Sequence, residues 1–315
     1  MGIMDLIWLE DCVALADTLN FSRAAELRHV TQPAFSRRIR ALEEWLGTPL
    51  FKRSRQGVQL TPAGEHFRTQ ATALVRSMHQ LRSETLEVAG RSAPSLTFAA
   101  THALSFTFFP EWIRGNPQLA ELGTFKLVSD TMRACERMMV QGGSQFLLCH
   151  HHPRMRLMLD PAQFRSVLVG GDVLLPLCAP REDGGPRWPL GERPNAKTAY
   201  LGYSADSGLG RILSGHAPLA PVIAKATPVF TSDLAATLLA MARAGDGVAW
   251  LPRSLAARDL ADGRLVEAAP EAPTLRIPIE IRLFRPVARL PRTAEALWEF
   301  FAAAAPVPGA EPVAA

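Results

Sequence analysis

The sequence predicts a winged helix-turn-helix domain at the N-terminus, a long helix after it, and a two-lobed α/β domain over the remaining chain. Three observations support this prediction. A helix with a basic face lies within the first sixty residues, an apolar seam with heptad spacing follows it, and strand-like and helix-like segments alternate afterwards. The expected domains are 1–62, 63–90 and 91–315, with lobe I at about 95–170 and 272–305 and lobe II at about 171–271.

Length and composition indicate a globular chain of two or three domains. The chain has 315 residues, of which 48% are hydrophobic and 20% are charged. Its four cysteines form no Cys-x-x-Cys pair, so neither a disulfide framework nor a structural zinc site is expected. The N-terminus lacks the pattern of a secretory signal, and no uncharged stretch approaches the length of a membrane span. We therefore expect a cytoplasmic protein without membrane association.

The segment from Thr31 to Gly47 is expected to form a helix with two distinct faces. Thr31 is a suitable N-cap, Pro33 fits the first turn, and Gly47 can close the helix in a left-handed conformation. At about 100° per residue, one face suits a core; it carries Phe35, Ile39, Leu42 and Leu46. The opposite face has almost no acidic residue; it carries Pro33, Ser36, Arg37 and Arg40.

This polar face has the chemistry of a helix that reads the DNA major groove. A guanidinium can donate two parallel hydrogen bonds to guanine or bind a phosphate, and the amide of Gln32 can pair with adenine. An ordinary surface helix with solvated arginines would show the same pattern. The flanking segments therefore decide between the two interpretations.

The flanking segments predict a complete winged helix-turn-helix. Residues 4–18 show helical spacing, a short helix over 22–27 is capped by Asn20 or Ser22, and a tight turn follows. Two extended runs then flank a basic tip between Thr48 and Thr61, which is typical of a β-wing. From Arg23 to Arg68 there are nine Lys/Arg and four Asp/Glu, a net charge of +5, whereas the whole chain carries +4. The basic charge favours double-stranded DNA as the partner.

The predicted DNA contacts lie on the basic helix and on the wing. Wing residues of this kind follow the phosphate backbone or enter the minor groove. The predicted contact residues are Gln32, Pro33, Ser36, Arg37, Arg40, Lys52, Arg53 and Arg55.

The N-terminal sequence resembles the signature of LysR-type transcriptional regulators. The matching positions are Thr-Gln-Pro-Ala-Phe-Ser-Arg-Arg-Ile at 31–39, Leu-Glu at 42–43, Leu-Gly at 46–47, Leu-Phe at 50–51, Arg53, and Leu-Thr-x-x-Gly at 60–64. Thr31 stands where serine is commoner in the family, and either residue caps a helix. The resemblance implies a dimerisation helix and a C-terminal effector-binding domain, with Gln32, Pro33, Ser36 and Arg37 at the groove and Arg53 in the wing.

The segment from Ala63 to about Ala89 is expected to form one long helix with a dimerisation seam. Apolar positions alternate in steps of four and three, as in a coiled coil; they are Phe67, Ala71, Leu74, Met78, Leu81, Thr85 and Val88. A single helix packed on its own domain is the alternative, but the narrow seam favours a homodimer. Two recognition helices would then meet the half-sites of a pseudo-palindromic operator, and a dimer of dimers would form a tetramer.

The C-terminal two-thirds alternate between strand-like and helical segments. Strands are expected at 96–100, 125–128, 146–149, 198–202, 222–224, 247–251 and 277–284, and helices at 131–140, 207–213, 232–244 and 292–304. Two apolar runs within 164–178, split by Gly170 and Gly171, are expected to cross to the second lobe. The pattern resembles the periplasmic-binding-protein-like effector domain of the same family.

An effector is expected between the lobes, where strand ends and helix N-termini offer free N–H groups. The predicted effector contacts are Thr101, His102, Ser105, His150, Tyr203, Ser204, Thr231 and Ser232. Each hydroxyl among them would serve equally well as a cap or a turn residue. The three consecutive histidines at 150–152 do not predict a metal site, because neighbouring strand residues point to opposite faces. His150 is expected to face the cleft or to be exposed, and no cofactor is expected.

Five methionines and a cysteine crowd one segment, so oxidation is a second candidate signal besides core packing; they are Met132, Met138, Met139, Met155, Met158 and Cys135. Within the LysR family, the helix-turn-helix and the segments 99–102 and 248–252 look most like the hypochlorite-responsive subgroup.

The leading hypothesis is a sequence-specific DNA-binding transcriptional regulator controlled by a small-molecule effector or by oxidation, with RNA polymerase as a candidate partner. The alternatives are a cytoplasmic solute-binding protein with a helical adaptor domain and a redox sensor acting through methionine oxidation. An enzyme is not expected, because the chain has no Gly-x-Ser-x-Gly elbow, P-loop, His-Glu-x-x-His motif or Rossmann glycine set.

Overall fold

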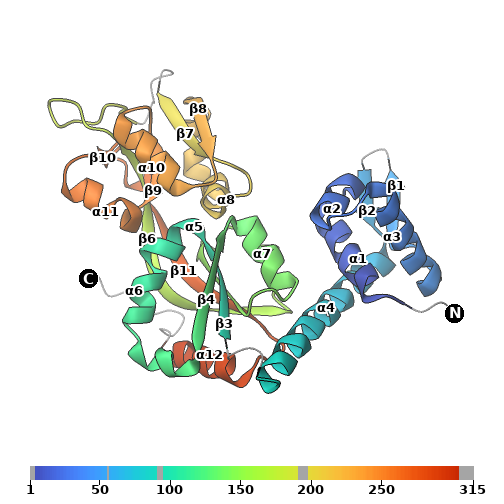
Figure 1. The fold of residues 1–315 in the computed structure, drawn as a ribbon. Coiled ribbons are helices and arrows are strands. Elements are labelled where there is room, and N and C mark those ends of the chain that lie inside the picture. Colours follow the sequence, from blue (N-terminus) through green and yellow to red (C-terminus); the bar gives the residue numbers. More distant parts are fainter. Residues whose placement is uncertain (1–3, 55–56, 91–94, 191–197, 305–315) are drawn as a thin grey trace. The chain divides into compact units, whose positions relative to one another are not determined.

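The computed structural model describes residues 4–54, 57–90, 95–190 and 198–304 (Figure 1). The chain divides into two compact units, one comprising 1–92 with 140–143 and the other 93–139 with 144–315. None of the helices in these described ranges combines the length and the apolar character that a membrane span requires.

The N-terminal unit is a winged helix-turn-helix, as the sequence predicts. It contains α1 (Leu6–Thr18), α2 (Phe21–Leu27), α3 (Gln32–Leu46), β1 (Phe51–Ser54), β2 (Gly57–Leu60) and α4 (Pro62–Val88). Strands β1 and β2 pair antiparallel and form the wing. Each of the four expected helices begins and ends within two residues of its predicted bounds.

Capping residues explain where these helices begin and end. The Asn20 side chain accepts hydrogen bonds from the backbone N–H groups of Ser22 and Arg23, so Asn20 is the N-cap of α2. Thr31 occupies the N-cap position of α3, but its side chain makes no capping hydrogen bond. Gly47 ends α3 with φ at +71°, the left-handed conformation that the sequence predicts for it.

The apolar face of α3 forms the core of this unit. Phe35, Ile39 and Leu42 are at most 2% exposed and pack with residues of α1 and α2. The Phe35 ring meets the Phe21 ring edge to face, with centroids 6.1 Å apart. Burying a side chain of this size contributes about 1.5–3 kcal/mol, so the three together fix the orientation of the opposite face.

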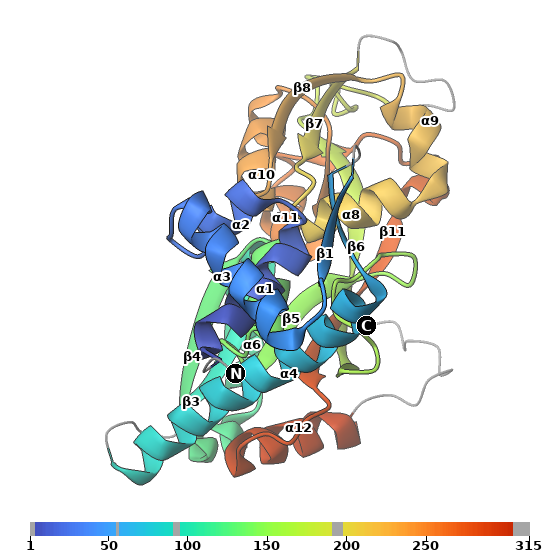
Figure 2. The same cartoon turned by 90° about the vertical axis from the view of Figure 1, so that its right-hand side faces the viewer.

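The C-terminal unit is built around a seven-stranded mixed sheet, and Figure 2 labels five of its strands, β3, β4, β5, β6 and β11. Six strands follow the order β10-β6-β11-β5-β3-β4, in which β10 spans Val266–Glu267, and β9 (Ala249–Pro252) pairs with β6. Strand β3 (Ser95–Thr101) lies parallel to β4 (Thr124–Asp130) and β5 (Phe146–His151). Two long antiparallel strands extend the sheet toward the second lobe, β6 (Phe164–Cys178) and β11 (Ile277–Pro286). A separate parallel pair, β7 (Ala199–Tyr203) and β8 (Thr227–Ser232), lies in that lobe.

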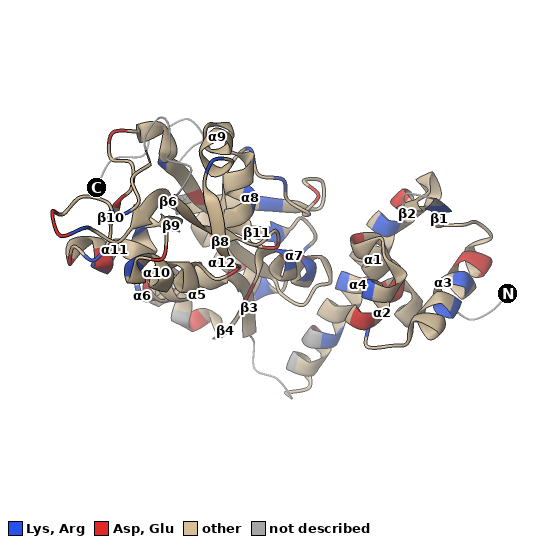
Figure 3. Cartoon of the chain, turned by 90° about the horizontal axis from the view of Figure 1, so that it is seen from above, with Lys and Arg blue, Asp and Glu red and all other residues tan. Residues whose placement is uncertain are grey.

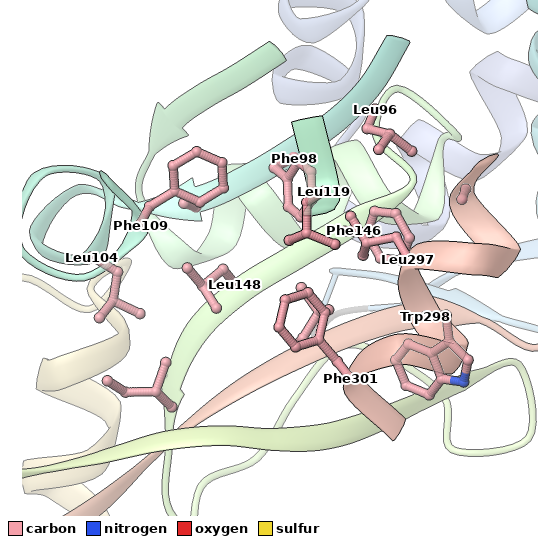
Figure 4. Packing of buried hydrophobic residues seen from close by; sticks show 14 of the residues in the cluster. Leu96, Phe98, Leu104, Phe109, Leu119, Phe146, Leu148, Leu297, Trp298 and Phe301 are labelled. Atoms are coloured by element: carbon pink, nitrogen blue, oxygen red, sulfur yellow. The ribbon is translucent and has the colours of Figure 1, made fainter. Parts of the chain in front are cut away.

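Helices surround the strands of this unit. They are α5 (His102–Thr107), α6 (Phe109–Arg114), α7 (Met132–Val140), α8 (Gly208–Gly215), α9 (Ala220–Ile223), α10 (Ala235–Ala244), α11 (Arg253–Ala261) and α12 (Arg292–Ala304), with short 3-10 turns at 117–122, 217–219 and 273–275. Helix α12 returns to the first lobe, where Phe301 stacks on Trp112 with centroids 4.3 Å apart. Figure 4 shows Phe301 and Trp298 of α12 in the apolar cluster with Phe98 and Phe146.

One sequence prediction for this unit is wrong in detail. Residues 222–224 do not form a strand: Pro221 lies in the first turn of α9, and the strand is β8, whose threonines and valine favour extended backbone. Residues 164–178, which hold the two apolar runs, form one continuous strand. Gly170 pairs with Ile281 of β11, and a Cβ at Gly170 would lie 2.9 Å from the Phe108 ring, so a larger residue here would require that ring to shift.

Candidate DNA-reading face and interlobe cleft

The polar face of α3 is open to solvent. Gln32, Pro33, Arg37 and Arg40 are all exposed, and Figure 3 marks the basic residues of this helix. Ser36 differs from the other predicted contacts because it is only 8% exposed. Its hydroxyl accepts a hydrogen bond of 2.9 Å from the Gln32 amide, so Ser36 orients the Gln32 side chain over the first turn of α3.

The wing offers two exposed basic side chains in the described part of the chain, Lys52 and Arg53 on β1. The Arg53 guanidinium lies 4.5 Å from the centroid of the Phe21 ring, a cation–π contact that joins the wing to the start of α2. The predicted contact Arg55 lies outside the described residues.

The predicted seam of α4 divides into a covered part and an exposed part. Ala71 is 1% exposed and, with Phe67, packs against Leu9 and Val13 of α1 in the same chain. These first two seam positions are therefore covered within the N-terminal unit. The later positions form an exposed apolar stripe on α4; they are Leu74, Met78, Leu81, Thr85 and Val88.

A cleft lies between the two lobes of the C-terminal unit, with about 380 Å³ of empty space when its open side is included. The ends of β3, β4 and β5 meet the starts of α5, α7, α8 and α10 there. The lining residues are Thr101, His102, Ala103, Asp130, Thr131, Met132, His150, Ser207, Gly208, Leu209, Asp233 and Ala235. The position, at strand ends and helix starts, is that expected for a ligand site in an open α/β sheet.

Three predicted effector contacts line this cleft, namely Thr101, His102 and His150. The other five lie outside its lining; they are Ser105, Tyr203, Ser204, Thr231 and Ser232. Several of these are used in internal hydrogen bonds. The Ser105 hydroxyl donates to the His102 carbonyl, the Tyr203 hydroxyl donates to the Trp250 carbonyl, and the Ser232 hydroxyl accepts from the Leu234 N–H.

The cleft's carboxylates and a further hydroxyl come from residues that are not among the predicted effector contacts. These residues are Asp130, Asp233 and Ser207. Asp233 and Ser207 lie one and three residues after the predicted contacts Ser232 and Ser204, and Asp130 lies two residues after the predicted strand 125–128. Ser207 is the N-cap of α8 and accepts from the Gly210 N–H. Asp233 lies within the helix that the sequence predicts from 232, whereas α10 begins at Ala235 and leaves Asp233 in the turn that lines the cleft.

Two polar atoms at the cleft are buried without a hydrogen-bond partner in the described chain, Thr101 Oγ1 and His150 Nε2. His150 is 3% exposed, so the alternative expectation of an exposed histidine is wrong. Its Nε2 lies 4.0 Å from Asp172 Oδ2, and burial lowers the pKa of His150 to about 4, which leaves the ring neutral near pH 7. Thr101 and His150 therefore bring uncharged hydrogen-bonding groups to a site that also carries two carboxylates.

Ion pairs join the two lobes beside the cleft. Glu136 of α7 is fully buried and accepts a 2.7 Å hydrogen bond from Arg211 of α8 and a 2.8 Å bond from the Met158 N–H. Arg133 and Asp206 form a second pair at 3.4 Å. Burial raises the pKa of Glu136, and Arg211 opposes that shift. Since α7 and α8 both line the cleft, these contacts couple its two walls.

Most sulfur atoms of the methionine-rich segment are shielded from solvent. Met132, Met139 and Met155 are at most 7% exposed, whereas Met158 is 38% exposed. Cys135 is also buried, and burial raises its pKa to about 12, which keeps the thiol protonated and unreactive. Among the described residues, no group of three His, Cys, Asp or Glu side chains is placed to hold a metal ion.

Known protein families match both the N-terminal and the C-terminal unit. Residues 6–65 match the family model "Bacterial regulatory helix-turn-helix protein, lysR family", and residues 89–306 match "LysR substrate binding domain". The HTH-type transcriptional regulator YjiE of Escherichia coli is 31% identical over 294 residues, which cover 92% of each chain.

Two solved structures extend over nearly the whole chain. Full-length HypT of Salmonella typhimurium, described as a hypochlorite-specific LysR-type transcriptional regulator, is 32% identical with a TM-score of 0.55, over 94% of this chain and 97% of that one. DarR of Vibrio fischeri in complex with DNA is 30% identical with a TM-score of 0.53, over 96% and 99%.

Proposed function

The chain belongs to the LysR family of bacterial transcriptional regulators, and from this premise we propose how it binds DNA and receives its signal. It is a DNA-binding regulator with an effector-binding domain. We propose that α3 reads the major groove through Gln32, Pro33, Arg37 and Arg40. The wing residues Lys52, Arg53 and Arg55 contact the phosphate backbone of the DNA. The observation that carries this proposal is the exposed, acid-poor face of α3 opposite a buried apolar face.

Replacing Arg37 by alanine tests this assignment. Loss of one base or phosphate contact is worth about 1–3 kcal/mol, so operator affinity should fall about 5- to 150-fold while the fold is retained. Fluorescence anisotropy with duplexes from the intergenic region beside the gene would measure the change. Arg258→Ala is the matched control, because that side chain is 89% exposed in the C-terminal unit. Equal affinity of Arg37→Ala and wild type would remove Arg37 from the interface.

The exposed stripe on α4 supports a homodimer. Five positions from Leu74 to Val88 lie at heptad spacing and are open to solvent, and pairing two such helices would bury them. The dimer presents two α3 helices to the half-sites of a pseudo-palindromic operator, and two dimers form a tetramer. The regulator acts in the cytoplasm, where its DNA is, without enzymatic activity, and RNA polymerase is its partner at promoters.

The cleft supports a small polar effector as the first candidate signal. Thr101 Oγ1 and His150 Nε2, which have no hydrogen-bond partner among the described residues, lie at the same site as the carboxylates of Asp130 and Asp233. A ligand with both hydrogen-bond donors and acceptors would satisfy groups of both kinds. Closure of the lobes around it would shift the regulator between two DNA-bound arrangements.

Oxidation is the second candidate signal, and one observation favours it. Met158 is exposed, and its own N–H is bonded to Glu136, which pairs with Arg211 across the lobes. A sulfoxide at Met158 would therefore form beside the ion pair that couples α7 to α8. The likeness to HypT, which is described as hypochlorite-specific, supports this candidate.

One experiment separates the two signals. Footprints on the operator are compared before and after candidate small ligands, and before and after mild hypochlorite, for wild type, Thr101→Val and Met158→Leu. A cleft effector predicts that Thr101→Val loses the ligand response about 10-fold and keeps the oxidant response unchanged. An oxidation signal predicts that Met158→Leu loses the hypochlorite response. If neither variant differs from wild type, both assignments fail.

A further inference from the structure

A buried carboxylate beneath the recognition helix carries an inference that rests on the proposed mode of DNA binding. Asp11 of α1 is completely buried. Its Oδ1 accepts a 2.9 Å hydrogen bond from Arg28 Nε, and its Oδ2 lies 3.3 Å from Arg38 Nη1. Arg28 lies at the end of α2, in the turn that leads into α3, and Arg38 lies within α3. One carboxylate therefore binds both the entry to the recognition helix and the helix itself.

The network around Asp11 extends to the long helix α4. Arg28 also donates to Glu10, the residue before Asp11. The other oxygen of Glu10 lies 3.5 Å from Nε2 of His79 in α4. Arg28 and Arg38 are both partly buried, at 26% and 34% side-chain exposure. These contacts tie α1, the turn, α3 and α4 to one pair of adjacent acids.

The buried ion pair of Asp11 is better explained as a device that orients helices than as a source of folding stability. Moving charges out of water costs several kcal/mol, and a well-packed apolar set is often at least as stable. Asp11 orients two segments at once, because each of its two carboxylate oxygens accepts a hydrogen bond from a different guanidinium. The angle of α3 relative to α1 and the turn is then fixed by two charge-assisted contacts.

The arginines of this region divide into two groups. Arg37 and Arg40 are exposed on the polar face of α3, whereas Arg38 lies on the flank of the core face and is turned inward to Asp11. A freed guanidinium at Arg28 or Arg38 would add a sequence-independent phosphate contact beside the groove. Such contacts strengthen binding to every duplex and so reduce discrimination between sites.

We propose that Asp11 is a positioning residue for sequence discrimination: it orients the recognition helix through Arg28 and Arg38 and keeps both guanidiniums away from DNA phosphates. Asp11 does not touch DNA in this account. Its effect is on the ratio of operator affinity to affinity for unrelated duplexes.

Asp11→Asn in the full-length protein tests the proposal. Anisotropy is measured with an operator duplex and with a scrambled duplex of the same length, over a series of salt concentrations. The ratio of the two affinities should fall about 10-fold or more, and binding to the scrambled duplex should strengthen, with a salt slope steeper by about 1–2. Glu26→Gln is the matched control, since Glu26 is exposed on α2 and its loss changes the net charge equally.

The outcomes distinguish positioning from a merely structural role. A structural role predicts that affinity for both duplexes falls together with helical content, leaving their ratio as in Glu26→Gln, and this result would overturn the proposal. A wild-type protein that does not discriminate between the duplexes would instead refute the proposed DNA-reading face.

Arg38→Gln gives an answer even where Asp11→Asn fails to fold. If Asp11 holds Arg38 inward, this variant should leave the salt slope for scrambled DNA unchanged. If Arg38 contacts phosphate directly, the slope should become shallower by about 1, and the proposal is then wrong.

Discussion

Gly64→Ala is expected to destabilise the N-terminal unit by about 3 kcal/mol or more and to abolish specific DNA binding at growth temperature. Gly64 lies in the first turn of α4, where a Cβ would stand 2.1 Å from the Leu50 carbonyl oxygen. That oxygen accepts the Thr61 N–H at 2.9 Å, so it cannot move without breaking the contact that joins the wing to α4. Because the clash is with backbone, side-chain repacking offers no relief. Thermal unfolding of the full chain and anisotropy on the operator measure the two effects.

Gly47→Ala is the comparison variant for this prediction. Gly47 has φ at +71°, and no atom of the described residues lies within 4 Å of the position of a Cβ. Alanine there therefore costs only the strain of the left-handed backbone, about 1–2 kcal/mol. The midpoint of unfolding should therefore fall further in Gly64→Ala than in Gly47→Ala. Equal midpoints would mean that the close approach of Gly64 to Leu50 does not limit stability.

The N-terminal unit shows what local signals can predict. The bounds of α3 follow from a cap, a proline and a glycine that are all within the segment, and its core face follows from helical period. The inward direction of Arg38 does not follow from such signals, because its partner Asp11 is 27 residues earlier in the chain. The angular position of Ser36 on the helix and the family resemblance both predict it at the groove. Its burial depends on the neighbouring helices, which the period of α3 does not describe.

For the cleft, the sequence predicts the position of the site but not every residue that lines it. The sequence indicates that strand ends and helix starts form the site, and three of the predicted effector contacts, Thr101, His102 and His150, line the cleft. Which residue of a turn enters the cleft depends on where the next helix begins. A start of α10 at Ala235 rather than at Ser232 puts Asp233 in the lining and leaves Thr231 on exposed β8. A shift of two or three residues is within the ordinary error for element boundaries.

Arg211→Met is expected to destabilise the C-terminal unit by about 3–5 kcal/mol at neutral pH, because it leaves the fully buried Glu136 carboxylate without its cationic partner. The loss should depend on pH. Burial already raises the folded-state pKa of Glu136 with Arg211 present, and removing Arg211 removes the largest opposing influence. Between the unfolded value of about 4.3 and the raised folded value, the folded variant binds more protons than the unfolded chain.

The sign of the pH effect follows from this difference in proton binding. Stability from protonated Glu136 is fully present below the unfolded pKa and is lost as the pH rises through the folded pKa. The deficit of Arg211→Met relative to wild type should therefore shrink between pH 7.5 and pH 5, as measured by urea unfolding at each pH. The double variant with Glu136→Gln has no carboxyl to titrate at this position, so its deficit should be the same at both values. A deficit of Arg211→Met that is equally large at pH 5 would show that packing of the Arg211 side chain, and not its charge, holds α7 against α8.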